Sequence, residues 1–194
     1  MDFKHQEKLA YLIGVALGDG NLSNPNGRAI RLRISCFSGY PKLVEEITET
    51  IRYLLPYNKI STVRKGNSRC FDISVYSNQL AVWMPWVPGQ GSKFRQHARV
   101  PAWILEEHGF ARVCLKGLIQ TDGCIYTDRG YQMVNFVNAS RELAQDVYDM
   151  FLLLDYRPTL RTDRNGPVRI KHSVRVARKS DVARLIRDLG LYKA

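Results

Sequence analysis

The chain has 194 residues, 45% of them hydrophobic and 24% charged, which is typical of a globular protein and excludes an intrinsically disordered one. Lys and Arg number 29 against 18 Asp and Glu, and the net charge of +11 favours a polyanionic partner, above all nucleic acid. The net charge alone does not exclude a generally basic surface that has no dedicated nucleic-acid site.

Hydrophobic periodicity predicts a nearly all-apolar, central helix first, then a turn-rich connector, a strand, an amphipathic helix, a hairpin of two strands and a short helix. These elements are expected at residues 6–18, 21–27, 31–36, 41–55, 59–65 with 69–76, and 78–86. The Pro- and Gly-rich residues 88–92 break the pattern and indicate a linker. Beyond it we expect a brief helix, a second apolar helix, a strand, a helix, a hairpin and a last helix. They are placed at residues 101–107, 112–121, 131–137, 141–154, around 165–166, and 180–189.

No apolar run approaches the roughly 20 residues of a membrane-spanning helix, and the N-terminus lacks the apolar segment of a signal peptide. Cysteines 36, 70, 114 and 124 show no Cys-x-x-Cys spacing, so we expect small buried thiols in a reducing compartment. The sequence therefore predicts an intracellular protein that is not secreted and has no membrane partner.

Two segments about a hundred positions apart end alike, LIGVALGDG at 12–20 and LKGLIQTDG at 115–123. Each places small residues on one helix face, namely Gly14 with Gly18 and Gly117 with Thr121. Small faces allow two helices to approach closely, which would bring Asp19 and Asp122 together. One such segment alone would be read as a buried helix with a glycine cap, but its recurrence favours a shared site.

Two carboxylates at adjacent helix C-termini are unfavourable unless a cation or a proton offsets them. The pair therefore predicts a divalent-metal site, with Mg²⁺ as the default ion because carboxylate oxygens are hard ligands. We assign Asp19, Asp122, Gly18 and Thr121 to this site.

Residues 31–38 align without a gap over 131–138, and both halves repeat the same order of elements. Alternation gives each half a strand face that is largely basic and polar, suited to the major groove of DNA. The residues expected on the DNA-facing side are Arg31, Arg33, Ser35, Asp72, Ser74, Tyr76, Arg169, Lys171, Ser173 and Arg175.

The two Asp-Gly segments resemble the signature of the LAGLIDADG homing endonucleases, of the monomeric, single-chain kind with two repeats. The resemblance implies an α+β fold of two pseudo-twofold-related αββαββα repeats, with the motif helices at the interface and antiparallel sheets forming a DNA-binding saddle. The repeats would span residues 1–95 and 96–194, with a linker at about 87–100. It also implies Mg²⁺-dependent cleavage of both strands of a long pseudo-palindromic site, with Ca²⁺ or Mn²⁺ able to substitute in binding studies.

By the same resemblance, Asp19 and Asp122 match the metal-binding acids, and Lys93 and Lys193 match the lysine that follows the last helix of each repeat. Ser38 and Asn138 stand where relatives carry a water-positioning residue. The chain departs from the motif at Leu17 and Gln120, where the family has an acid.

The function expected is a free-standing, intron-encoded DNA endonuclease that acts in intron homing. An RNA maturase for its host intron, or a cleavage-inactive DNA-binding protein on the same scaffold, is the alternative. Retention of both acids favours the nuclease.

Overall fold

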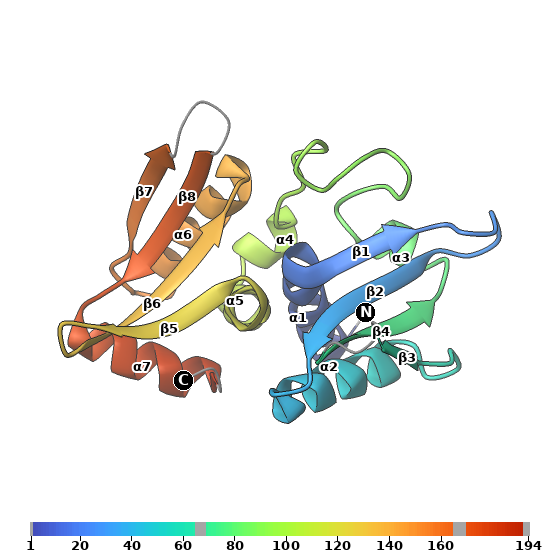
Figure 1. Ribbon diagram of the computed structural model, residues 1–194, viewed down its shortest axis with the longest axis horizontal. Coiled ribbons are helices and arrows are strands. Elements are labelled where there is room, and N and C mark those ends of the chain that lie inside the picture. Colours follow the sequence, from blue (N-terminus) through green and yellow to red (C-terminus); the bar gives the residue numbers. More distant parts are fainter. Residues whose placement is uncertain (1, 65–68, 165–169, 192–194) are drawn as a thin grey trace.

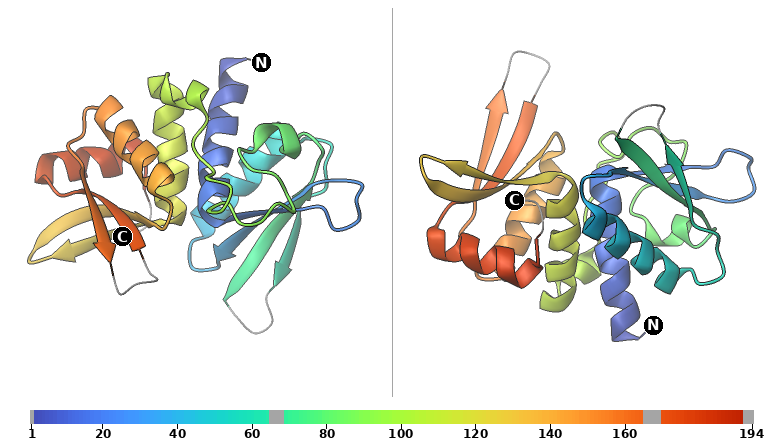
Figure 2. Two further views of the ribbon diagram at one scale, coloured as in Figure 1. Left: turned by 90° about the horizontal axis from the view of Figure 1, so that it is seen from above. Right: turned by 60° about the horizontal axis from the view of Figure 1, so that its bottom comes forward.

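The computed structural model describes residues 2–64, 69–164 and 170–191. Two helices, α1 (Phe3–Asp19) and α5 (His108–Thr121), lie side by side at its centre, and a sheet extends to each side of them (Figure 1). In the view from above, the sheets spread outward from the C-terminal ends of these helices, and α2, α3, α6 and α7 lie on the side of the sheets toward the N-terminus of α1 (Figure 2, left).

Each half repeats one order of elements. After α1 come β1 (Gly20–Ser23), β2 (Arg31–Phe37), α2 (Pro41–Leu54), β3 (Ser61–Arg64), β4 (Cys70–Tyr76) and α3 (Leu80–Trp83). After α5 come β5 (Gly123–Asp128), β6 (Tyr131–Asn138), α6 (Arg141–Leu153), β7 (Thr159–Arg164), β8 (Ile170–Val176) and α7 (Lys179–Leu189). A short helix, α4 (Ala102–Leu105), lies between the halves. The sheets are antiparallel, in the orders β1-β2-β4-β3 and β5-β6-β8-β7, so the predicted α+β fold of two αββαββα units is confirmed.

The ends of several elements differ from the sequence prediction. The predicted connector at 21–27 is wrong at its start, because Gly20–Ser23 pairs with β2 as a strand. Helix α1 begins at Phe3 rather than at residue 6, since the Asp2 carboxylate caps it by accepting the His5 N–H at 2.7 Å. Cys36 and Cys114 are buried as expected, whereas Cys70 and Cys124 are exposed, which corrects the prediction for these two thiols.

The gap-free alignment of 31–38 over 131–138 is also wrong. The register pairs Ile34 with Gly20 and Phe136 with Gly123, so Ile34 corresponds to Phe136 and not to Val134. The first half thus has two more residues than the second between this strand position and the helix that follows. Because the shift is even, each side chain keeps its face of the sheet.

The contact between α1 and α5 depends on glycine. A Cβ atom on Gly14 would overlap the carbonyl of Cys114, and one on Gly117 would lie 2.7 Å from the carbonyl oxygen of Tyr11. Such distances leave no room for a side chain between the two backbones. The motif glycines therefore set the separation of the two helices.

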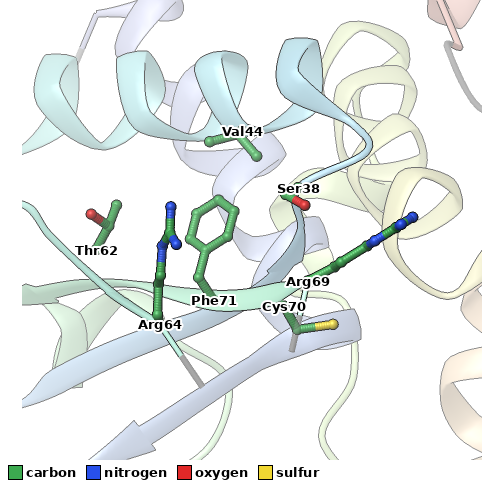
Figure 3. Close-up of a pocket in the computed structure, with 7 residues that line it drawn as sticks. All are labelled: Ser38, Val44, Thr62, Arg64, Arg69, Cys70 and Phe71. Carbon is green, nitrogen blue, oxygen red and sulfur yellow. The ribbon is translucent and has the colours of Figure 1, made fainter. Parts of the chain in front are cut away.

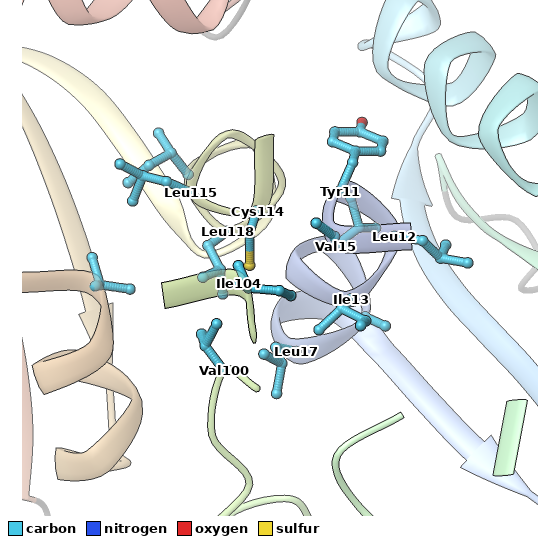
Figure 4. Packing of buried hydrophobic residues seen from close by; sticks show 14 of the residues in the cluster. Tyr11, Leu12, Ile13, Val15, Leu17, Val100, Ile104, Cys114, Leu115 and Leu118 are labelled. Carbon is cyan, nitrogen blue, oxygen red and sulfur yellow. The ribbon is translucent and has the colours of Figure 1, made fainter. Parts of the chain in front are cut away.

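The core continues from this interface into both halves. Val15 of α1 and Leu118 of α5 are buried at the interface, and Val100 and Ile104 of the segment that leads into α5 belong to the same buried cluster (Figure 4). In the described part of the chain, no helix has the length and apolar character required to cross a membrane.

Replacing Gly117 with Ala tests the helix contact. The added methyl group meets backbone atoms of α1, so the helices must separate, and we expect a net loss of unfolding free energy of about 1–3 kcal/mol. Gly109→Ala in the same helix is the control, because its Cβ would meet only side-chain atoms, the tip of the Phe3 ring at 3.3 Å and the carboxylates of Glu107 and Glu7 at 3.8 and 3.9 Å. That variant should be neutral or gain up to about 1 kcal/mol from helix propensity. Equal stability of the two variants in urea denaturation would contradict this packing.

Candidate metal centre and nucleic-acid interface

The two motif aspartates lie at the same end of the central helix pair. Asp19 is the last residue of α1 and is exposed, while Asp122 caps α5 and is half-buried. A Cβ atom on Gly18 would lie 3.5 Å from the carboxyl carbon of Asp122, which places this carboxylate beside the end of α1. Both carboxylates also attract the ammonium group of Lys93. The aspartates therefore share one site at the midline of the molecule.

Lys93 supplies a cation to this site from within the chain. Its Nζ donates hydrogen bonds to the carbonyl oxygens of Ala16 (3.0 Å), Leu17 (2.7 Å) and Gly18 (2.5 Å) at the end of α1. The last turn of α1 has no basic residue of its own, so Lys93 neutralises the negative end of the helix. Burial lowers the pKa of Lys93 from 10.5 to about 8, and attraction by Asp122 and Asp19 acts in the opposite direction.

The second aspartate is oriented by Asn138. Its amide nitrogen donates to Asp122 Oδ2 at 2.8 Å, and its amide oxygen accepts the Ser140 N–H at 2.9 Å. By the observed register, Asn138 corresponds to Cys36, not to Ser38. The two acids therefore have different neighbours.

Ser38 lies elsewhere. It lines a pocket of about 440 Å³ between α2 and the end of the first sheet, together with Val44, Phe71 and Arg64 (Figure 3). Lys193 and Arg169, also predicted from the sequence, lie outside the described residues.

The oxygen donors at the midline fit a hard divalent cation. Two carboxylates converge there, and substrate phosphate oxygens and water can complete the coordination of Mg²⁺. The Thr121 hydroxyl donates back to the carbonyls of Gly117 (2.9 Å) and Leu118 (3.1 Å). Over residues 2–64, 69–164 and 170–191, no cluster of three or more His, Cys, Asp or Glu side chains could hold a metal by itself. The pair would thus bind metal jointly with a substrate.

The sheet register places the predicted DNA-facing side chains on common faces. On the first sheet this face carries Arg31, Arg33, Ser35, Asp72, Ser74 and Tyr76. On the second it carries Lys171, Ser173 and Arg175. Asp72 and Ser74 are each only 6% exposed, so neighbouring side chains cover them.

Several residues on these faces were missed by the sequence analysis. Asn21 and Ser23 on β1 lie beside Arg33 and Arg31, and on the second sheet Cys124, Asn135, Thr159 and Arg161 share the face of Arg175. The connector assigned to residues 21–27 hid the first two, although Asn21 and Ser23 alternate with the buried Leu22.

A buried polar network also escaped the sequence analysis. Gln120, which replaces a motif acid, is 2% exposed and accepts the Tyr11 hydroxyl at 2.9 Å. Its amide nitrogen donates to Glu46 of α2 at 3.0 Å, and Lys116 pairs with the other oxygen of Glu46 at 2.5 Å. The departure from the motif thus ties α1, α2 and α5 together.

Comparisons with known proteins agree with this architecture. Residues 110–190, less than half of the chain, match the family model described as LAGLIDADG-like domain. Two curated relatives are the replicative DNA helicase DnaB of Rhodothermus marinus, 34% identical over 39% of this chain, and the ribonucleoside-diphosphate reductase NrdEB subunit alpha of Bacillus subtilis, 21% identical over 80%. The matched segments span only 8% and 15% of the lengths of these relatives.

Solved structures match over nearly the whole chain. Variants of the homing endonuclease I-DmoI align with a TM-score of 0.68 at 18% identity, covering 98% of this chain and 99% of theirs. I-DmoI in complex with DNA and Ca aligns at 0.67 and 18%, covering 95% and 90%. Full-length DUF199/WhiA from Thermatoga maritima aligns at 0.69 and 11%, covering all of this chain and 58% of that one.

Residues 110–190 are therefore similar to the LAGLIDADG-like domain, and over 98% of its length the chain has the fold of the homing endonuclease I-DmoI. The resemblance inferred from the two Asp-Gly segments is confirmed.

The lowered pKa of Lys93 predicts how stability depends on pH. Between pH 8 and 10.5 the folded protein has lost the Nζ proton while the unfolded chain still holds it, so the free energy of unfolding should rise with pH in this window. The rise is on the order of 3 kcal/mol at most. Urea denaturation in EDTA of the wild type and of Lys93→Met measures this rise in the free energy of unfolding, since the variant lacks the ammonium group. If the free energy of unfolding of the two proteins changed with pH in parallel, the lowered pKa of Lys93 would be contradicted.

Proposed function

We propose that the protein is a sequence-specific DNA endonuclease that makes double-strand breaks in a long, pseudo-palindromic site by divalent-metal-dependent phosphodiester hydrolysis. The observation that carries this proposal is the convergence of Asp19 and Asp122 on Lys93 at the midline. A pair of carboxylates held together at this cost in electrostatic repulsion suits a site that binds cations and phosphate.

The partner proposed is double-stranded DNA. The chain carries a net charge of +11, and the two polar sheet faces lie on either side of the midline site, related by an approximate twofold axis (Figure 2). Duplex DNA has matching approximate symmetry, and its major groove admits β-strands. I-DmoI, whose fold this chain shares, has been solved with DNA in the presence of Ca, Mg and Mn. Because both repeats lie in one chain, we propose that it acts as a monomer.

In this proposal different residues of the chain bind the metal ions, orient a carboxylate and stabilise the charge on the phosphate. Asp19 and Asp122 would hold the divalent ions, which when bound activate water and stabilise the leaving oxygen. Asn138 keeps the Asp122 carboxylate in one orientation through the 2.8 Å hydrogen bond. Lys93 places a positive charge where phosphate charge develops, the role expected of it from the sequence. Lys193 is proposed for the matching role in the second repeat.

A DNA-binding protein without cleavage activity is the second candidate. The observation in its favour is that the same fold occurs in DUF199/WhiA, so the fold alone does not establish cleavage. The comparisons give no support for an RNA partner, and intron homing stays a prediction from the sequence.

Conversion of either acid to its amide separates binding from cleavage. Asp19→Asn or Asp122→Asn should abolish double-strand cleavage, because each removes a carboxylate that the metal requires. Binding should persist or tighten, since less negative charge faces the phosphates. Gel assays with supercoiled plasmid in Mg²⁺, beside binding titrations in Ca²⁺, measure both. Wild-type cleavage by either variant would refute the metal assignment.

Selection of cleaved duplexes from a randomised library identifies the substrate. The proposal predicts that the duplexes cleaved in Mg²⁺ share a long pseudo-palindromic sequence, and that in Ca²⁺ the protein binds this sequence without cleaving it. Selective binding with no cleavage in Mg²⁺ or Mn²⁺ would favour the cleavage-inactive alternative.

A further inference from the structure

Asp72 is an acidic residue on the sheet face proposed to bind DNA. It lies on β4, on the polar face of the first sheet, where a carboxylate would repel phosphate groups. Yet it is only 6% exposed, so it has little surface with which to contact a base. Its role must therefore come through its neighbours.

Those neighbours hold it against an arginine. The Ser35 hydroxyl donates to Asp72 Oδ1 at 2.8 Å, which fixes the carboxylate. Asp72 Oδ2 lies 3.9 Å from Nη1 of Arg33 on β2. The strands β1, β2 and β4 lie side by side (Figure 1), and from β1 the Asn21 amide oxygen accepts a hydrogen bond from Arg33 Nη2 at 3.2 Å. Arg33 is thus held between one partner on each side.

The Arg33 guanidinium, placed between Asn21 and Asp72, is still partly exposed. The Arg33 side chain is 40% exposed, so part of its fork of N–H donors is available above the sheet. An arginine fork that is fixed in direction can donate two parallel hydrogen bonds to O6 and N7 of guanine in the major groove. Holding the side chain before binding removes the entropy loss that a free arginine would suffer on contact.

The second sheet lacks this arrangement. The row Asn21–Arg33–Ser74–Ser61 corresponds to Cys124–Asn135–Arg175–Thr159, so the arginine there comes from β8. Within the described part of the chain, the Arg175 side chain has no hydrogen-bond or ion-pair partner, and Asn135 is bonded to Ser173 at 2.7 Å. Arg175 is therefore a matched control, because it is an arginine on the same kind of sheet face that no described side chain holds by a hydrogen bond or an ion pair.

We propose that Asp72, together with Asn21, is a positioning residue that fixes Arg33 to recognise one guanine in the half-site under the first sheet. Asp72 thereby determines specificity without contacting the DNA. The inference rests on the proposed function, because it assumes that the sheet faces bind a duplex.

The test uses the duplex selected by the wild type and a panel in which each base pair is replaced in turn, with affinity measured in Ca²⁺ by fluorescence anisotropy. Arg33→Gln should lose about tenfold of the discrimination at one base pair. Asp72→Ala should lose discrimination at the same base pair and keep it elsewhere, with undiminished affinity for unrelated duplexes. The double variant should be no worse there than Arg33→Gln alone, because both changes remove one interaction. Arg175→Gln should alter preference only in the other half of the site.

Asp72→Asn is the conservative variant. It retains an acceptor for Ser35 but loses the charge beside Arg33, so its discrimination at that base pair should fall between the wild type and Asp72→Ala. If circular dichroism shows that Asp72→Ala is unfolded, the test relies on Asp72→Asn alone. An unchanged preference profile in Asp72→Asn and Asp72→Ala, a uniform loss at every base pair, or additive effects in the double variant would overturn the positioning role. A wild-type protein that selects no duplex would instead overturn the proposed function.

Discussion

The close backbone contact between α1 and α5 is the constraint on which the remaining structure depends. Gly14 meets the Cys114 carbonyl and Gly117 meets the backbone of Tyr11, so the helices run together to their last turns. Their terminal carboxylates are then forced into one site. The half-buried ammonium group of Lys93 is the consequence, because it offsets both the like charges and the negative end of the α1 dipole.

The same contact imposes approximate symmetry, but the chain departs from it near the midline. Asp122 is oriented by Asn138, whereas the position corresponding to Asn138 in the first repeat is the buried Cys36. The polar network of Gln120 has no counterpart at Leu17, which is apolar and buried. A single chain permits such differences because each repeat can change independently, and the two DNA strands would then meet unequal surroundings.

Much of this was readable from the sequence because it depends on local periodicity. Alternation in residues 31–36 predicted both the strand and its basic face, and the paired Asp-Gly segments predicted which carboxylates meet. The short β1 strand was missed because its pairing with β2 is a tertiary contact, and the strand register was off by two because the lengths of the following loops differ. The three carbonyls that Lys93 caps are about 75 residues away in sequence, and no local pattern records them.

The central claim is that the carboxylates of Asp19 and Asp122 jointly hold the catalytic cations at the molecular midline. Anomalous scattering from crystals of the protein with its selected duplex and Mn²⁺ tests it most directly. The account predicts manganese peaks bonded to both carboxylates and to phosphate oxygens between the two sheets. Manganese bound away from these side chains, or carboxylates directed to separate places, would contradict it.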